Sequence, residues 1–170
     1  ARKEISQLYL PENTKFSITQ CLELIDQLSK RIKPLEDEII SSCQNVEDVA
    51  LLETIPGVGR LLAIIIYAEV VDIKRFKSAK ALASYTGLIP TIRASGDNVK
   101  SGGITRIGSR TLRTALVEAA IKAPRYSAEL NRMYWRIAHR SNPMKARVAI
   151  ARKLAMILYV MLTKREGFRK

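Results

Sequence analysis

Glycines alternate with basic residues near the middle of the chain, in a pattern that suits phosphate binding. Gly103 precedes Arg106, and Gly108 precedes Arg110 and Arg113. Glycine lets a ligand approach the backbone, N–H groups at a helix entrance attract anions, and arginine forks match phosphate oxygens. We therefore expect this stretch to clamp phosphates. The alternative is a solvated basic face, which is weakened because ordering a glycine-rich loop costs entropy.

A second phosphate-binding pattern is the turn Ile-Pro-Gly-Val-Gly at residues 55–59, which an apolar helix follows. Gly57 and Gly59 permit backbone geometry that a side chain would block. Their N–H groups, with the N-terminus of the helix opened by Arg60, then form an anion site for a DNA phosphate. The sequence thus predicts a helix–hairpin–helix element that positions a duplex without reading its sequence. The alternative is a plain turn that only redirects the chain.

The composition also favours a polyanionic partner. The 170 residues include 29 Lys plus Arg and 16 Asp plus Glu, which gives a net charge of +13 and a pI of about 10.0. Residues 1–55 are net acidic, so the whole positive excess lies after them. Such an excess attracts nucleic acid, the commonest intracellular polyanion.

Several other classes of protein are excluded. Cys21 and Cys43 are too few for a disulfide scaffold and fit a reducing compartment. With His139 as the single histidine, no zinc site of ordinary spacing can form. The longest apolar run, residues 61–68, is far short of the roughly 20 residues of a membrane span. We expect a cytoplasmic, nucleoid-associated chain that binds no membrane, no metal and no cofactor.

An N-terminal helical arm, residues 1–45, is predicted to precede a basic helical domain, residues 46–170. The arm repeats apolar residues every seven positions, in one column of Ile18, Ile25, Ile32 and Ile39 and another of Cys21, Leu28 and Leu35. This seam favours lengthwise packing on another helix, either a coiled-coil partner or the chain's own domain. Pro34 predicts a kink or a break near Lys33.

The fold class predicted for the whole chain is all-α. In the basic domain, apolar periodicity and caps predict helices over residues 46–52, 60–71, 78–85, 110–122, 127–139 and 143–164. Ser78 and Ser109 are the expected N-caps. Glycine, proline and Asp-Asn signals between residues 88 and 103 predict an exposed loop or irregular hairpin.

Aromatic residues alternate with arginines further along the chain. Tyr126, Tyr134 and Trp135 lie near Arg125, Arg132, Arg136 and Arg140. Such a pattern can grip nucleic acid by stacking and charge. We favour the alternative, in which the aromatic rings pack in the core and the arginines extend to solvent. His139 has no partner in the sequence that would give it a role.

Taken in order, these motifs resemble one family. The motifs are the 55–59 turn with its apolar helix, Gly-Leu-Ile-Pro at 87–90, Ser95-Gly96, G-x-I-T-x-x-G at 102–108 and L-R-x-x-L-x-x-A-A at 112–120. Residues 51–120 resemble the C-terminal domain of the insertion-sequence transposases that include the Piv pilin-inversion recombinase and the RNA-guided bridge recombinases. Several motifs in one order are far more specific than any single motif.

The resemblance implies that Ser95 is a nucleophile that attacks phosphorus in DNA, displaces a 3′ hydroxyl and forms a covalent protein–DNA ester. A serine hydroxyl needs a base or a metal and stabilised phosphoryl charge, and Arg93, Lys100 and Arg106 are the candidates for that stabilisation. Ser101, which also precedes a glycine, is the rival. Either serine could instead be a turn residue without chemistry.

Family members also carry a RuvC-like domain with an acidic metal-binding tetrad, for which Mg²⁺ is the expected ion. We expect this chain to lack that domain, to be a fragment of a transposase and to be inactive alone. The implied partners are DNA, a guide RNA, and a second copy through the arm. The alternatives are a non-catalytic helix–hairpin–helix DNA-binding module and a coiled-coil assembly domain.

Overall fold

The structure is a computed structural model of the 170-residue chain. It describes residues 9–95 and 98–168, and for residues 92–95 and 98–101 it describes the backbone alone. The chain divides into two compact units, Ala1–Ser42 and Cys43–Lys170. This division lies three residues before the predicted one.

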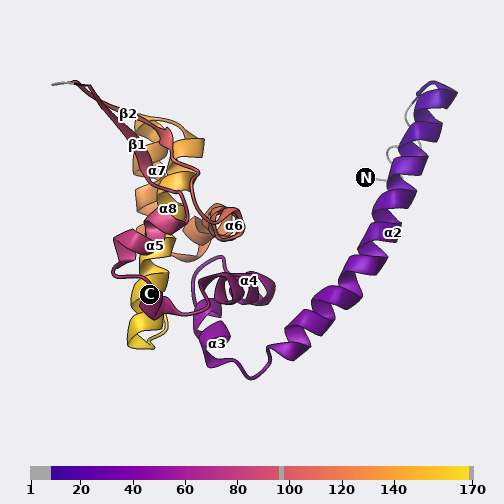
Figure 1. Ribbon diagram of the computed structural model, residues 1–170. Coiled ribbons are helices and arrows are strands. Elements are labelled where there is room, and N and C mark those ends of the chain that lie inside the picture. The colour runs from indigo at the N-terminus through magenta and orange to yellow at the C-terminus, as the bar shows by residue number, and fades with distance from the viewer. Residues whose placement is uncertain (1–8, 96–97, 169–170) are drawn as a thin grey trace. The chain divides into compact units, whose positions relative to one another are not determined.

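The helix that the structure describes in the first unit, α2 (Glu12–Ser42), runs without interruption through Pro34 (Figure 1). The predicted break near Lys33 is therefore wrong, and the alternative of a kink there stays a prediction. Proline removes one backbone donor from the helix, and it leaves the carbonyl of Lys30 without its usual partner. Because α2 contains no buried residue, water can satisfy that carbonyl and the helix continues.

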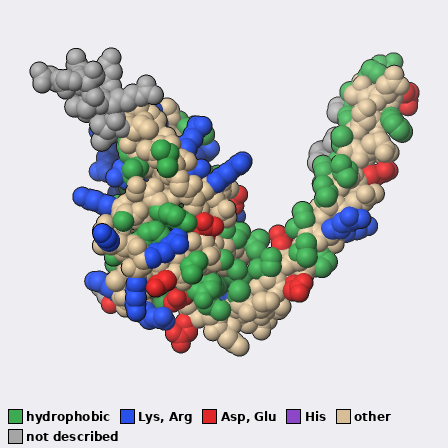
Figure 2. Space-filling view, in the orientation of Figure 1, with side chains coloured by type: hydrophobic (Ala, Val, Ile, Leu, Met, Phe, Trp, Pro, Cys, Tyr) green, Lys and Arg blue, Asp and Glu red, His purple; other side chains and the backbone are tan. Residues whose placement is uncertain are grey.

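The apolar seam of α2 is exposed within this unit. Ile25, Leu28 and Ile32 each expose half or more of their surface. Figure 2 shows hydrophobic side chains along the surface of the arm. The seven-residue spacing thus has no covering partner inside α2 itself, and its pairing as a coiled coil stays a prediction.

The second unit confirms the all-α class. Its elements are α3 (Glu47–Glu53), α4 (Arg60–Val70), the 3₁₀ turn Ile73–Arg75, α5 (Ala79–Tyr85), β1 (Pro90–Ser95), β2 (Asn98–Ile104), α6 (Arg110–Tyr126), α7 (Ala128–Arg140) and α8 (Pro143–Lys164). The two strands form an antiparallel hairpin at the place where a loop or irregular hairpin was expected. None of the helices described is long and apolar enough to cross a membrane.

Helix α8 is the centre of the core, and α3, α5, α6 and α7 all pack against it. Ile150, Leu154 and Leu158 of α8 are fully buried. Each such side chain stabilises the fold by about 1.5–3 kcal/mol relative to an exposed one. On α6, the buried alanines 119, 120 and 123 let neighbouring segments approach closely.

The helix starts follow the predicted capping. The hydroxyl oxygens of Ser78 and Ser109 accept hydrogen bonds from the N–H groups of Ala81 and Leu112, at 3.2 and 3.0 Å. The helix end that differs most from the prediction is that of α6, which continues through Pro124 to Tyr126, whereas the other ends agree within one residue. The carbonyl of Pro124 accepts a hydrogen bond from the Asn131 side chain at 3.0 Å, which ties the end of α6 to α7.

The turn between α3 and α4 packs tightly on α6. Gly57 has a φ of +85°, and a Cβ there would overlap the carbonyl oxygen of Ala119 and lie 2.8 Å from the N of Ala123. Gly59, in contrast, is the extended N-cap of α4, and nothing lies within 4 Å of where its Cβ would be. The two glycines therefore differ: Gly57 permits packing, and Gly59 leaves the start of α4 open.

This contrast predicts different effects of two alanine substitutions on folding. Gly57→Ala should lower the free energy of unfolding by about 2 kcal/mol or more, because it forces a left-handed φ and a backbone overlap. Gly59→Ala should lower it by less than about 1 kcal/mol, the cost of a poorer cap. Thermal unfolding of both variants measures the difference, and equal losses would contradict the packing role of Gly57.

Candidate nucleic-acid interface

The β-hairpin carries the candidate nucleophile and projects from the helical body of its unit (Figure 1). Its register pairs Arg93 with Lys100 and Ser95 with Asn98. Directly paired residues share a face of a hairpin, and so do residues two apart along one strand. Positions 93, 95, 98 and 100 therefore share one face. This register places the candidate serine on the same face as two cationic residues.

The same register separates the two candidate serines. Ser101 pairs with Ile92, one position out of phase with Ser95 and Asn98. Since successive residues of a strand alternate between faces, Ser101 belongs to the opposite face from Ser95. Of the two candidate serines, therefore, Ser95 alone shares a face with both Arg93 and Lys100.

Hydrogen bonds between the segment that precedes β1 and the segment that follows β2 fix the base of the hairpin. The N–H of Thr105 donates to the carbonyl of Ile89 at 2.9 Å, and its hydroxyl donates to the carbonyl of Gly87 at 3.3 Å. The N–H of Arg106 donates to the same Gly87 carbonyl at 3.2 Å. The Gly-Leu-Ile-Pro motif and the G-x-I-T-x-x-G motif thus bind each other.

Arg113 of α6 clamps this base. Its Nη1 donates to the carbonyl oxygens of Thr86 and Arg106 at 3.0 and 3.2 Å. The same Nη1 lies 2.7 Å from where a Cβ on Gly87 would be, so only glycine fits there without a shift. Arg113 was predicted to bind phosphate, and in the structure it holds two loop carbonyls together.

Gly108 completes the contact between the hairpin and the helices. Its φ is +116°, and a Cβ there would overlap the carbonyl of Tyr85. The N–H of Ser109 donates to that same carbonyl at 2.8 Å, and Ser109 then caps α6. Three of the motifs that support the family resemblance, at 87–90, 102–108 and 112–120, therefore meet at the base of the hairpin.

The remaining predicted cations differ in their availability. Arg106 and Arg110 are exposed, and neither forms an ion pair with any residue that the structure describes. Arg60 is engaged, because its guanidinium contacts the Glu53 carboxylate at 2.7 Å and the Cys43 carbonyl at 2.6 Å. Arg60 therefore holds the end of α3 and the start of the unit against α4.

The structure does not bring the two predicted phosphate sites together. Arg110 begins α6, whereas the turn at Gly57 packs against Ala119 and Ala123 further along that helix. With a rise of 1.5 Å per residue, the two sites are separated by roughly 15 Å along α6. Lys and Arg side chains are spread over the visible face of this unit (Figure 2). DNA contact at each site stays a prediction.

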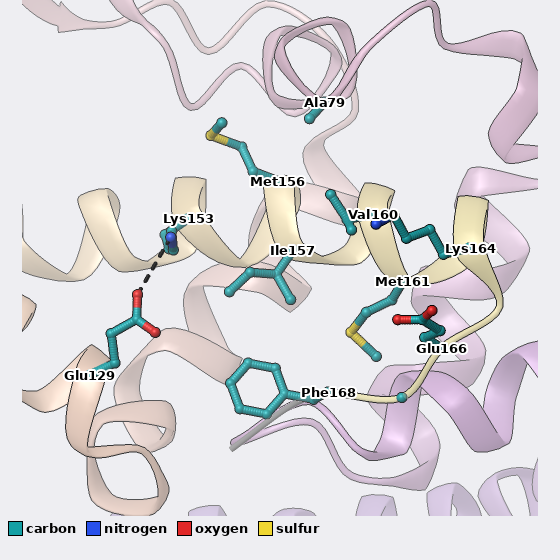
Figure 3. Close-up of a pocket in the computed structure, with 11 residues that line it drawn as sticks. Ala79, Glu129, Lys153, Met156, Ile157, Val160, Met161, Lys164, Glu166 and Phe168 are labelled. Carbon is teal, nitrogen blue, oxygen red and sulfur yellow. Dashed lines mark ion pairs between the residues drawn. The ribbon is translucent and has the colours of Figure 1, made fainter.

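A cavity of about 420 Å³ lies elsewhere, beside the second half of α8. Ile157 and Met161 of α8 line it together with Phe168 of the C-terminal segment, and an ion pair of 3.5 Å between Glu129 and Lys153 borders it (Figure 3). None of the predicted site residues with described side chains lines this cavity. It is therefore separate from the hairpin site.

Metal binding finds no support among the described side chains. No group of three or more His, Cys, Asp or Glu residues lies close enough there to hold an ion.

Two exposed aromatic residues, Trp135 on α7 and Tyr126 at the end of α6, differ from our preferred interpretation. Trp135 exposes 51% of its surface and Tyr126 exposes 68%, so the core-packing prediction is wrong for both. Trp135 contacts His139, for which the sequence analysis predicted no role. The spacing of four residues between Trp135 and His139 could have predicted this contact, because residues i and i+4 are neighbours on a helix surface.

Comparisons with known proteins agree on one family. A sequence model described as the Transposase IS116/IS110/IS902 family matches residues 49–136, from α3 through most of α7. The transposase for insertion sequence element IS1111A of Coxiella burnetii is 32% identical over 158 residues, which cover 89% of this chain and 43% of that protein. The pilin gene-inverting protein of Moraxella bovis is 31% identical over 173 residues, which cover 99% of this chain and 52% of that protein.

A third relative, the putative transposase y4pF/y4sB of Sinorhizobium fredii, is 30% identical over 149 residues, or 85% of this chain and 38% of that protein. The chain thus spans about half or less of the length of these curated relatives.

The clamp at the hairpin base predicts a difference between two arginines of α6. Arg113→Met keeps the aliphatic stem and removes both hydrogen bonds to loop carbonyls, which should cost about 1–3 kcal/mol of the free energy of unfolding. Arg110→Met, at an exposed position on the same helix, should change it by no more than about 0.5 kcal/mol. Urea unfolding measures both. A small change in both variants would show that Arg113 does not hold the base.

Proposed function

This chain belongs to the IS116/IS110/IS902 transposase family, and we propose that its second unit is the DNA-binding domain that carries the nucleophile. In the complete transposase it acts in DNA transposition and recombination, with Ser95 forming the covalent bond to DNA. The observation that supports this role best is the hairpin register, which gives Ser95 the same face as Arg93 and Lys100.

The reaction at Ser95 is a displacement at phosphorus. The bond from Oγ to phosphorus forms, and the bond from phosphorus to the 3′ oxygen of the neighbouring nucleotide breaks. The hydroxyl proton passes to a general base, and the departing 3′ oxygen takes up a proton. The product is a serine ester of the 5′ phosphate, whose energy allows the strand to be rejoined to a new 3′ hydroxyl.

Cationic residues on the same face as Ser95 would stabilise the negative charge that develops in this step. Negative charge builds up on the non-bridging phosphoryl oxygens, and positive groups fixed in advance stabilise it. Arg93 and Lys100 are opposite each other in the register, two positions from the Ser95–Asn98 pair. The hydrogen bonds of Arg113 to the carbonyls of Thr86 and Arg106 support this proposal, because they hold the base of the hairpin on α6.

The metal of the complete protein belongs outside this chain in our proposal. Mg²⁺ held by the acidic tetrad of a RuvC-like domain would supply charge stabilisation at the scissile phosphate. The described residues of this chain would orient the serine and bind DNA phosphates.

DNA positioning would come from two ends of α6. Arg106 and Arg110 offer exposed guanidinium groups at the start of the helix. The open N-terminus of α4 at Gly59 offers backbone N–H groups near its other half. Phosphate contacts at both ends would hold a duplex in register without reading bases.

The arm would assemble two copies. Its exposed Ile and Leu seam follows the seven-residue repeat of a coiled coil, and a second α2 of the same sequence supplies a matching seam. A dimer would present two serines, one for each strand exchanged. A guide RNA as a further partner follows from the family resemblance alone.

A pair of serine variants tests the proposed role. In the complete transposase, Ser95→Ala should lower recombination of element-end DNA by roughly 10³-fold or more, because it removes the nucleophile. Binding of that DNA should change by less than about twofold, since phosphate contacts elsewhere supply the affinity. Recombination and gel-shift assays on the same DNA measure the two quantities.

Ser101→Ala is the matched control, with the same change on the other face of the hairpin, and it should recombine as the wild type does. Normal recombination by Ser95→Ala would contradict the proposal. It would favour the alternative, a non-catalytic DNA-binding module.

A further inference from the structure

Helix α7 carries an exposed, ordered stack of aromatic rings. The rings of Trp135 and His139 lie 5.4 Å apart between centroids and 30° from parallel. Tyr134 meets Trp135 edge-on, at 5.3 Å and 83°. Two neighbours thus fix the orientation of the indole, while 51% of the surface of Trp135 stays exposed.

The arginines of α7 surround this stack. On a helix with 100° between residues, Arg132, Trp135, Arg136 and His139 fall within one exposed sector, and all four are exposed. Neither arginine forms an ion pair with a residue that the structure describes. The one acidic residue of α7, Glu129, pairs with Lys153. The sector therefore combines a flat aromatic surface with two uncompensated positive charges.

These features fit the face of an unpaired nucleobase with phosphates on either side. A base stacks on an indole with about 1–3 kcal/mol, whatever its identity. Arginine forks match the phosphate oxygens that flank it. A duplex cannot stack a base on Trp135 in this way, because each base face within it is covered by the neighbouring base.

We propose that the exposed sector of α7 binds single-stranded nucleic acid, with one base stacked on Trp135 and the adjacent phosphates on Arg132 and Arg136. The two arginines are about 6 Å apart along the helix axis, so they reach phosphates on both sides of one nucleotide. The site is independent of Ser95 and of the duplex contacts proposed for α4 and α6. It would hold a strand that has been separated from its complement.

The chain reports on this site directly, because Trp135 is its single tryptophan. The 170-residue chain is titrated with an oligothymidylate, an oligouridylate and a mixed-sequence duplex, and tryptophan fluorescence is recorded. Both single strands should quench the emission, and the duplex should not. Base stacking alone does not distinguish DNA from RNA. The affinities for the deoxy strand and the ribo strand are therefore compared, and the tighter of the two shows which nucleic acid the site prefers.

Variants locate the binding energy. Trp135→Leu should weaken single-strand affinity by roughly 5- to 150-fold, the equivalent of one lost base stack, as measured by anisotropy of a labelled strand. The affinity of Trp135→Phe should lie between those of the wild type and Trp135→Leu, because phenylalanine keeps a smaller aromatic ring. Arg132→Gln should weaken affinity and also make it less dependent on salt.

Tyr126→Leu is the matched control, because Tyr126 is exposed but lies outside the stack at the end of α6. It should change single-strand affinity by less than about twofold. The fluorescence titration does not depend on Ser95, so failure of the nucleophile proposal leaves this proposal intact. Unchanged fluorescence with both single strands, or equal quenching by the duplex, would overturn the proposal.

Discussion

The guanidinium of Arg113, which joins the carbonyls of Thr86 and Arg106, holds together the two segments from which the β-hairpin departs. The hairpin has only two strands, and such a ribbon is marginally stable by itself. Its position relative to the helices depends on this clamp, on the Thr105 hydrogen bonds and on the close approach at Gly87 and Gly108. The chemistry that we propose for Ser95 would need that position, because a small displacement of a nucleophile costs large factors in rate.

Close packing of small residues connects the rest of the unit to the hairpin base. Gly57 and the alanines of α6 allow the α3–α4 turn to lie against the helix that carries Arg113. Helix α6 in turn packs on α8, the centre of the core. The fixed frame therefore runs from α8 through α6 to the hairpin, and the two candidate phosphate sites lie at different positions on that frame.

Local rules predicted the helices well, because apolar periodicity, Ser caps and Pro143 determine where α5, α6 and α8 begin. They failed where a residue's preference was overridden by its surroundings. Pro34 did not break a helix whose carbonyls face water, and Gly102 and Gly103 lie in a strand although glycine favours a loop. The role of Arg113 could not be predicted from the sequence, because its hydrogen-bond partners, Thr86 and Arg106, lie 27 and 7 residues away along the chain. The family resemblance implied Ser95 as the nucleophile, which stays a prediction, and only the register could show that Arg93 and Lys100 share its face.

The most direct measurement is the chemical location of a covalent DNA adduct. The complete transposase is incubated with element-end DNA, denatured and digested with nuclease and protease, and the peptides are analysed by mass spectrometry. Our account predicts a phosphonucleotide on Ser95 and none on Ser101. An adduct on any other residue, or efficient recombination without an adduct, would contradict it.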